Sequence, residues 1–135
     1  CSFLDGANVR ILGYGGEVLC AYMIKGNVIV DGDAGNSVGY DMENGSILVN
    51  GNVGYKCGEW MRDGAIEITG DAGVTAGRSM RRGSITIKGN AGKETGREMV
   101  GGTLHVSGKI ESIANWRYGG TIYEGEREIM HLIKK

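Results

Sequence analysis

GDAGVTAGRSMRRGSITIKG, spanning Gly70 to Gly89, is the clearest copy of a unit that the chain repeats with a period of 19 residues. When the copies are aligned at this period, four columns contain glycine in every regular copy: Gly32, Gly35, Gly39, Gly45, Gly51, Gly54, Gly58, Gly64, Gly70, Gly73, Gly77, Gly83, Gly89, Gly92, Gly96 and Gly102. A further column holds five of the six methionines: Met23, Met42, Met61, Met80 and Met99. A glycine-rich composition does not by itself place residues in register, so this fixed period indicates a solenoid of stacked coils.

Each unit ends in an alternating apolar run, such as Ile66 with Ile68 or Ile85 with Ile87. This alternation predicts a strand with one buried face. The rest of each unit has frequent glycines and no helical pattern, so we expect only strand and turn. Stacked units would place each strand about 4.8 Å from its copy, as a parallel pair. The sequence therefore predicts an all-β, parallel β-helix of about six coils in a single domain, residues 1–135, with repeats beginning near 13, 32, 51, 70, 89 and 108.

The same alignment separates inward from outward positions. The columns that contain Ala34, Cys57 and the methionines are apolar or small, and with the strand residues they should fill the interior. The columns that contain Asn36 and Asp41 are mixed in character and should face outward. The column glycines are expected at corners, where a positive φ or a close approach of neighbouring backbones excludes a Cβ atom.

An acidic or amide residue follows a corner glycine in each regular coil: Asp33, Asn52, Asp71 and Asn90. Because these residue types tolerate the left-handed conformation and bind nearby backbone groups, we expect left-handed, locally capped corners here. One oxygen ligand per coil is too few for a calcium site. The methionine column is interpreted as core packing and not as a Cu(I) site. We therefore predict no metal site, and no catalytic or cofactor-binding residue.

The three cysteines lack a CxxC spacing, which predicts neither a disulfide framework nor a zinc site. A reducing, cytoplasmic setting is therefore expected. Cys57 lies in an inward column, so it should be a buried and inert thiol. Cys20 replaces a corner glycine and could be exposed there, which leaves a reactive or regulatory role open as the lesser alternative. Cys1 is interpreted as an ordinary residue or the mark of a trimmed chain, in preference to a catalytic nucleophile.

The segment 126–135 is predicted to be a cap or tail on the last coil. Ile129, Leu132 and Ile133 are spaced i, i+3 and i+4, which is typical of a short amphipathic helix. Such a helix could cover the open edge of the sheet, where exposed strands invite unwanted pairing, or it could dock onto a partner.

The charge balance is nearly even, with 15 basic and 16 acidic residues. This balance argues against a dedicated nucleic-acid binder or a polybasic membrane protein. The sequence has no apolar run long enough to span a bilayer and no secretory signal. We therefore expect neither nucleic acid nor membrane as a partner.

The repeats GDAGNSVGYDMENGSILVNG, GNVGYKCGEWMRDGAIEITG and GDAGVTAGRSMRRGSITIKG resemble the glycine-rich GXGXG repeat, over about residues 13–108. That repeat is shared by one subunit of formylmethanofuran dehydrogenase and the C-terminal domain of the glutamate synthase large subunit. The resemblance implies a right-handed β-helix that packs against catalytic domains and has no catalytic group or cofactor of its own. It also implies the protein subunits of an oxidoreductase complex as partners, without distinguishing the two enzymes.

Outward aromatic and arginine side chains form a candidate protein interface: Tyr40, Tyr55, Trp60, Arg78 and Arg97. The alternative is a solvated ladder of charges, in which stacked residues of opposite sign pair between coils. The predicted pairs are Glu59 with Arg78, Glu43 with Arg62, and Asp63 with Arg82.

Three functions are considered. The first, favoured by the resemblance, is a non-catalytic structural subunit or domain of an oxidoreductase complex. The second is a free-standing interaction scaffold that forms homo-oligomers. The third is an enzyme that holds an anionic substrate on the basic face, and it requires a cleft of converging polar groups that the repeat does not supply.

Overall fold

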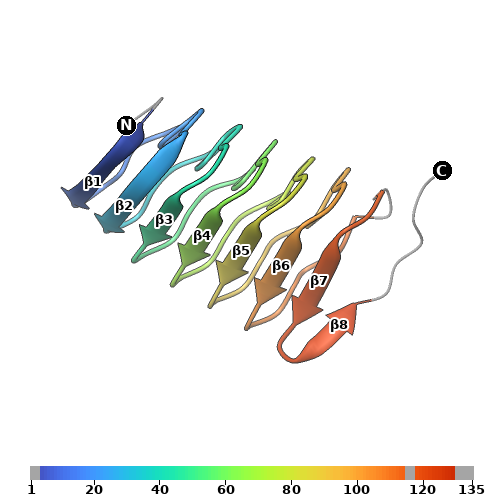
Figure 1. Cartoon of the computed structure of the whole chain (residues 1–135). Coiled ribbons are helices and arrows are strands. Elements are labelled where there is room, and N and C mark those ends of the chain that lie inside the picture. The colour runs from blue at the N-terminus through green and yellow to red at the C-terminus, as the bar shows by residue number, and fades with distance from the viewer. Residues whose placement is uncertain (1–3, 115–117, 130–135) are drawn as a thin grey trace.

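The computed structural model describes residues 4–114 and 118–129, and within those ranges the chain forms stacked coils of strand and turn with no helix (Figure 1). Consequently no helix in the described residues could cross a membrane. The strands are β1 (Asp5–Leu12), β2 (Lys25–Asp31), β3 (Ser46–Val49), β4 (Ala65–Ile68), β5 (Ser84–Ile87), β6 (Thr103–Val106), β7 (Thr121–Glu124) and β8 (Arg127–Ile129). This confirms the predicted β-solenoid of about six coils of about 19 residues.

The strands form a single sheet in which each strand pairs with the next along the chain. β1 to β7 are parallel, and the register keeps equivalent residues side by side, as Ile47, Ile66 and Ile85 show. The hydrogen bonding between coils continues through the turns, where the Gly54 amide donates to the Gly35 carbonyl at 3.0 Å. Each coil is therefore fastened to its neighbours on both the sheet side and the turn side.

The core is a continuous apolar column inside the coils. All the methionines of the aligned column are fully buried, as are the paired strand residues such as Ile66 and Ile68. The columns of Ala34 and Cys57 are buried as well. The predicted inward columns are thus confirmed. Because successive coils place nearly identical side chains on top of one another, each coil extends the same packing by one layer.

The corner glycines are required for two different reasons. Gly64 has a φ of +96°, and a Cβ atom added there would lie 2.7 Å from the carbonyl oxygen of Gly45. Gly70 has no left-handed φ, but an added Cβ atom would lie 2.7 Å from the carbonyl oxygen of Gly51. Close approach between coils therefore excludes a side chain even where the backbone conformation would accept one.

The prediction of left-handed backbone at Asp33, Asn52, Asp71 and Asn90 is wrong. Apart from Cys20, the left-handed non-glycine residues lie instead in two other columns, and they include Ser37, Asp41 and Trp60, with φ values of 60°, 52° and 62°. The physical reason is that the Asp and Asn side chains accept hydrogen bonds from the next coil and not from their own turn. Since the left-handed residues recur in successive coils, they are part of the architecture and not a local sign of a site.

The sheet ends in a strand that the sequence did not predict. β8 pairs with β7 in the antiparallel direction, with Ile129 opposite Ile122, after the chain reverses near Gly125. The amphipathic helix predicted to include Ile129 is therefore wrong at that residue, because Ile129 extends the sheet. Leu132 and Ile133 lie outside the described residues. The pairing of β8 with β7 covers the edge of β7.

Candidate interaction face

The most regular polar column is occupied by bonds between coils. The backbone amides of Asn52, Asp71, Asn90 and Lys109 each donate, at 2.8 Å, to the Oδ1 atom of the residue one coil before: Asp33, Asn52, Asp71 and Asn90. Aspartate and asparagine alternate along this ladder, so the two carboxylates lie two coils apart. The column therefore supplies side-chain acceptors for backbone amides without placing like charges side by side.

A second set of residues flanks the buried methionines and faces outward; we call it the turn face. One of its columns contains Tyr22, Asp41, Trp60, Ser79 and Glu98, and the other contains Ile24, Glu43, Arg62, Arg81, Val100 and Tyr118. Tyr118 belongs to the second column although its spacing is shorter, because its amide bonds to Met99 as the amide of Val100 bonds to Met80. Five of the ten large apolar side chains exposed among the described residues lie here: Tyr22, Ile24, Trp60, Val100 and Tyr118.

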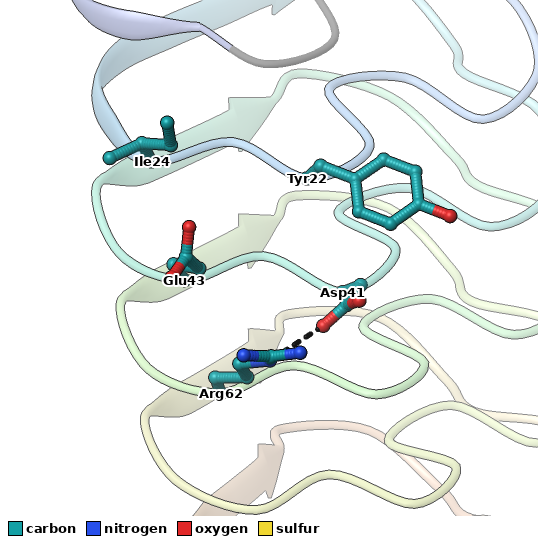
Figure 2. A pocket seen from close by; sticks show the side chains of 5 residues that line it. All are labelled: Tyr22, Ile24, Asp41, Glu43 and Arg62. Atoms are coloured by element: carbon teal, nitrogen blue, oxygen red, sulfur yellow. Dashed lines mark hydrogen bonds and ion pairs between the residues drawn. The ribbon is translucent and has the colours of Figure 1, made fainter.

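The first coils of the turn face enclose a hollow of about 180 Å³. Figure 2 shows Ile24, Glu43 and Arg62 on successive coils, with Tyr22 and Asp41 opposite them. Nε of Arg62 donates to Oδ1 of Asp41 at 2.8 Å. The predicted pair of Glu43 with Arg62 is therefore wrong, because Arg62 reaches across the turn to the neighbouring column and not along its own.

The later coils of the turn face enclose a larger hollow of about 270 Å³, lined by Trp60, Arg78, Ser79, Arg81, Glu98, Val100 and Tyr118. The guanidinium of Arg81 lies over the Trp60 ring, 5.7 Å from its centroid. Arg78 lies 3.8 Å from Glu59, which confirms that predicted pair, and 3.5 Å from Glu98. Arg81 forms no ion pair with any described residue.

The third predicted ion pair, between Asp63 and Arg82, does not form in the described structure. Oδ1 of Asp63 instead accepts the backbone amide of the next residue, Gly64, at 2.9 Å. This short local bond turns the carboxylate toward its own corner, so it is not extended toward the arginine of the following coil.

The five predicted interface residues do not form one patch. Trp60 and Arg78 line the same hollow. Tyr55 is 49% exposed in a different column, where Lys56 lies 5.8 Å from its ring centroid. Tyr40 is half-buried against Tyr22, with the rings edge to face and 5.6 Å between centroids, and burial raises its pKa.

Arg97, the remaining predicted residue, lies 3.2 Å from Glu94 of its own coil. The sequence interpretation also left out Glu43, Val100 and Tyr118 as interface residues. The period of 19 residues was the signal that could have identified Glu43 and Val100, since both fall in the column of Ile24.

The cysteines differ from one another in the structure. Cys57 is buried and free, and burial raises the pKa of its thiol to about 12, as predicted for an inert thiol. Cys20 is buried and disulfide-bonded, so the exposed, reactive thiol that the sequence left open does not exist there. The expectation of no disulfide, drawn from the cysteine spacing, is therefore wrong at Cys20. Its side chain points into the core, although its φ of 59° matches the glycines of its column. Cys1 lies outside the described residues.

In the described part of the chain, no group of three or more His, Cys, Asp or Glu side chains could hold a metal ion.

No known protein-family model matches the sequence, and no curated protein matches it. Function is therefore inferred from the residues and contacts above, together with the resemblance of the repeat to the GXGXG repeat.

Proposed function

We propose that this chain is a non-catalytic structural and assembly unit of an oxidoreductase complex, of the glutamate synthase or formylmethanofuran dehydrogenase kind. The observation that carries the proposal is the ladder that starts at Asp33, in which each side-chain oxygen accepts the backbone amide of the next coil. The most repeated polar groups of the chain thus hold the stack together, and exposed aromatic and charged side chains face outward.

The charged groups around the larger hollow of the turn face favour packing over chemistry. A catalytic site needs polar groups that converge on one reacting atom. Here Arg78 is engaged by Glu59 and Glu98, and Arg81 lies on the Trp60 ring. These contacts engage the arginine side chains with neighbouring groups of the same face, where they can support a partner protein.

The exposed side chains also have the composition of a protein interface. Trp60 is 43% exposed and lies beside two arginines, and Tyr55 is exposed on another column. Tryptophan, tyrosine and arginine dominate the binding energy of protein interfaces. The repeated backbone hydrogen bonds would present these side chains without the loss of entropy that ordering a loop requires.

The choice of an oxidoreductase complex rests on the resemblance of the glycine and methionine columns to the GXGXG repeat. In that family the β-helix supports catalytic domains, while the reacting groups belong to other domains or subunits. The same role here would make this chain a rigid surface for assembly.

Affinity purification of the tagged chain from its native cell at modest salt, followed by mass spectrometry, tests the proposal. We expect catalytic subunits of one of the two oxidoreductases to co-purify. The variant Trp60→Ser should lose them if the turn face is the contact surface, and Tyr55→Ser should lose them if the separate column that contains Tyr55 is the contact surface. Recovery of the wild-type chain with no oxidoreductase subunit would contradict the proposal and favour a free-standing scaffold.

A further inference from the structure

Five of the six residues in the Ile24 column of the turn face, all but Tyr118, have a symmetric order. It runs, one residue per coil, through Ile24, Glu43, Arg62, Arg81 and Val100. Arg62 lies at the centre, and its charge is compensated by Asp41 at 2.8 Å. Glu43 and Arg81 lie one coil to either side and are opposite in charge, while Ile24 and Val100 lie two coils to either side and are both aliphatic.

Glu43 and Arg81 have no ion-pair partner among the described residues of the chain. The other charged residues of the turn face do have one: Asp41 pairs with Arg62, and Glu98 pairs with Arg78. The two aliphatic residues of this column are also exposed, Ile24 at 39% and Val100 at 52%. From Ile24 to Val100 the column therefore presents two charges without an ion pair among the described residues, flanked by two aliphatic side chains, in an order that its own reverse would complement.

We propose that a second copy of this chain packs on the turn face in the antiparallel direction, with the two-fold axis crossing the coil of Arg62. A rotation about such an axis reverses the column and places it against itself. Glu43 then meets Arg81 of the second copy, and Ile24 meets Val100 of the second copy. Both copies have the same spacing between coils, about 4.8 Å, so all four contacts form in one register.

The neighbouring column fits the same arrangement. Trp60 lies on the coil of Arg62, so the axis brings it against Trp60 of the second copy, where two aromatic rings can pack. A parallel arrangement is disfavoured, because it would set the two columns of the face against each other on the same coil and oppose Glu43 to Asp41 of the second copy. Charge complementarity thus selects both the partner and its direction.

This contact between identical chains goes beyond the proposed assembly role and does not depend on it. The purified chain alone is sufficient to test it, whereas the assembly role needs the native cell. Failure of one proposal is therefore distinguishable from failure of the other.

Sedimentation velocity on the purified chain and its charge-reversed variants is the test. We expect the wild-type chain, with a monomer mass of 14.3 kDa, to sediment at twice that mass. Glu43→Arg and Arg81→Glu each oppose like charges, so each variant should be a monomer. The double variant Glu43→Arg/Arg81→Glu restores both pairs and should be a dimer again. Lys88→Glu, at a residue that pairs with Glu67 at the sheet, is the control and should stay a dimer.

Mixing the two single variants gives the sharpest outcome. The Glu43→Arg chain carries arginine at both positions and the Arg81→Glu chain carries glutamate at both, so every contact between them joins opposite charges. Two monomeric proteins should therefore form a one-to-one dimer when they are mixed. This result also shows that each variant is folded. A monomeric wild-type chain, a dimer that neither reversal dissociates, or a mixture that stays monomeric would each overturn the proposal.

Discussion

Oδ1 of Asn52 accepts the backbone amide of Asp71 from the next coil at 2.8 Å. The same bond recurs along the stack from Asp33 to Lys109. A repeated side chain therefore does the work that strand pairing does on the sheet side of each coil. This relationship explains why the column keeps a carboxylate or amide in each regular coil.

Replacing Asn52 with alanine should remove one acceptor from this ladder. The amide of Asp71 would turn to water, since the site is exposed, so we expect the free energy of unfolding to fall by about 0.5–1.5 kcal/mol. Urea denaturation measures this difference. Asp71→Asn, which keeps the acceptor, is the control, and an equal loss in both variants would show that the hydrogen bond is not responsible.

The alternation of aspartate and asparagine predicts a salt-dependent effect. Asn52→Asp would place three carboxylates in adjacent coils, from Asp33 to Asp71, about 4.8 Å apart. Like charges directly opposite one another should destabilise the fold by about 0.2–1 kcal/mol, and added salt should reduce the loss. Urea denaturation at low and high salt checks this, and a loss that salt leaves unchanged would argue against charge repulsion.

Gly64 and Gly13 separate the two reasons for a corner glycine. Both have a left-handed φ, of +96° and +106°, but only at Gly64 would a Cβ atom meet a backbone oxygen, 2.7 Å away. We expect Gly13→Ala to cost about 1–2 kcal/mol for its conformation. Gly64→Ala should cost about 2 kcal/mol more, because the carbonyl of Gly45 is fixed in the stack. Thermal and urea unfolding of the two variants gives the comparison, and equal losses would rule out crowding as the cause.

Cys57 should make stability depend on alkaline pH. The pKa of its thiol rises from 9.0 to about 12 on burial. Its contribution to the free energy of unfolding is therefore fully present below pH 9. Between those pH values the thiol ionises only in the unfolded chain, which lowers the free energy of unfolding by about 1.4 kcal/mol per pH unit. Cys57→Ala is the control, because Ala76 occupies the same column in the next coil. Equal pH slopes for the two proteins, in urea denaturation across this range, would contradict the predicted pKa.

Much of the fold was predictable because the period assigns each residue to a column. Once Ile66 and Ile85 share a column, both must face the same way, and the burial of that column follows from its composition. The same reasoning correctly assigned Met61 and Cys57 to the core.

What the period could not predict is how a long side chain leans within its coil. Arg62 follows Glu43 by one period of the repeat, so the two share a column, yet Arg62 binds Asp41 of the neighbouring column. A guanidinium group can reach across the turn as easily as along the stack. The last strand, β8, was not predicted from the sequence for a related reason. Ile129 has the spacing of a helical residue, but pairing with Ile122 satisfies the edge of β7, a long-range contact that a short window of sequence does not contain.

Removal of one whole coil tests the central claim most directly, namely that the regular coils are equivalent structural units. Deleting residues 51–69 joins Asn50 to Gly70 and lets β3 pair with β5 in the original register. We expect this variant to keep the β-sheet circular dichroism signal and to unfold cooperatively, with lower stability. Deleting residues 51–60, about half a coil, should destroy the register. If both deletions unfold the chain alike, the equivalence of the coils is contradicted.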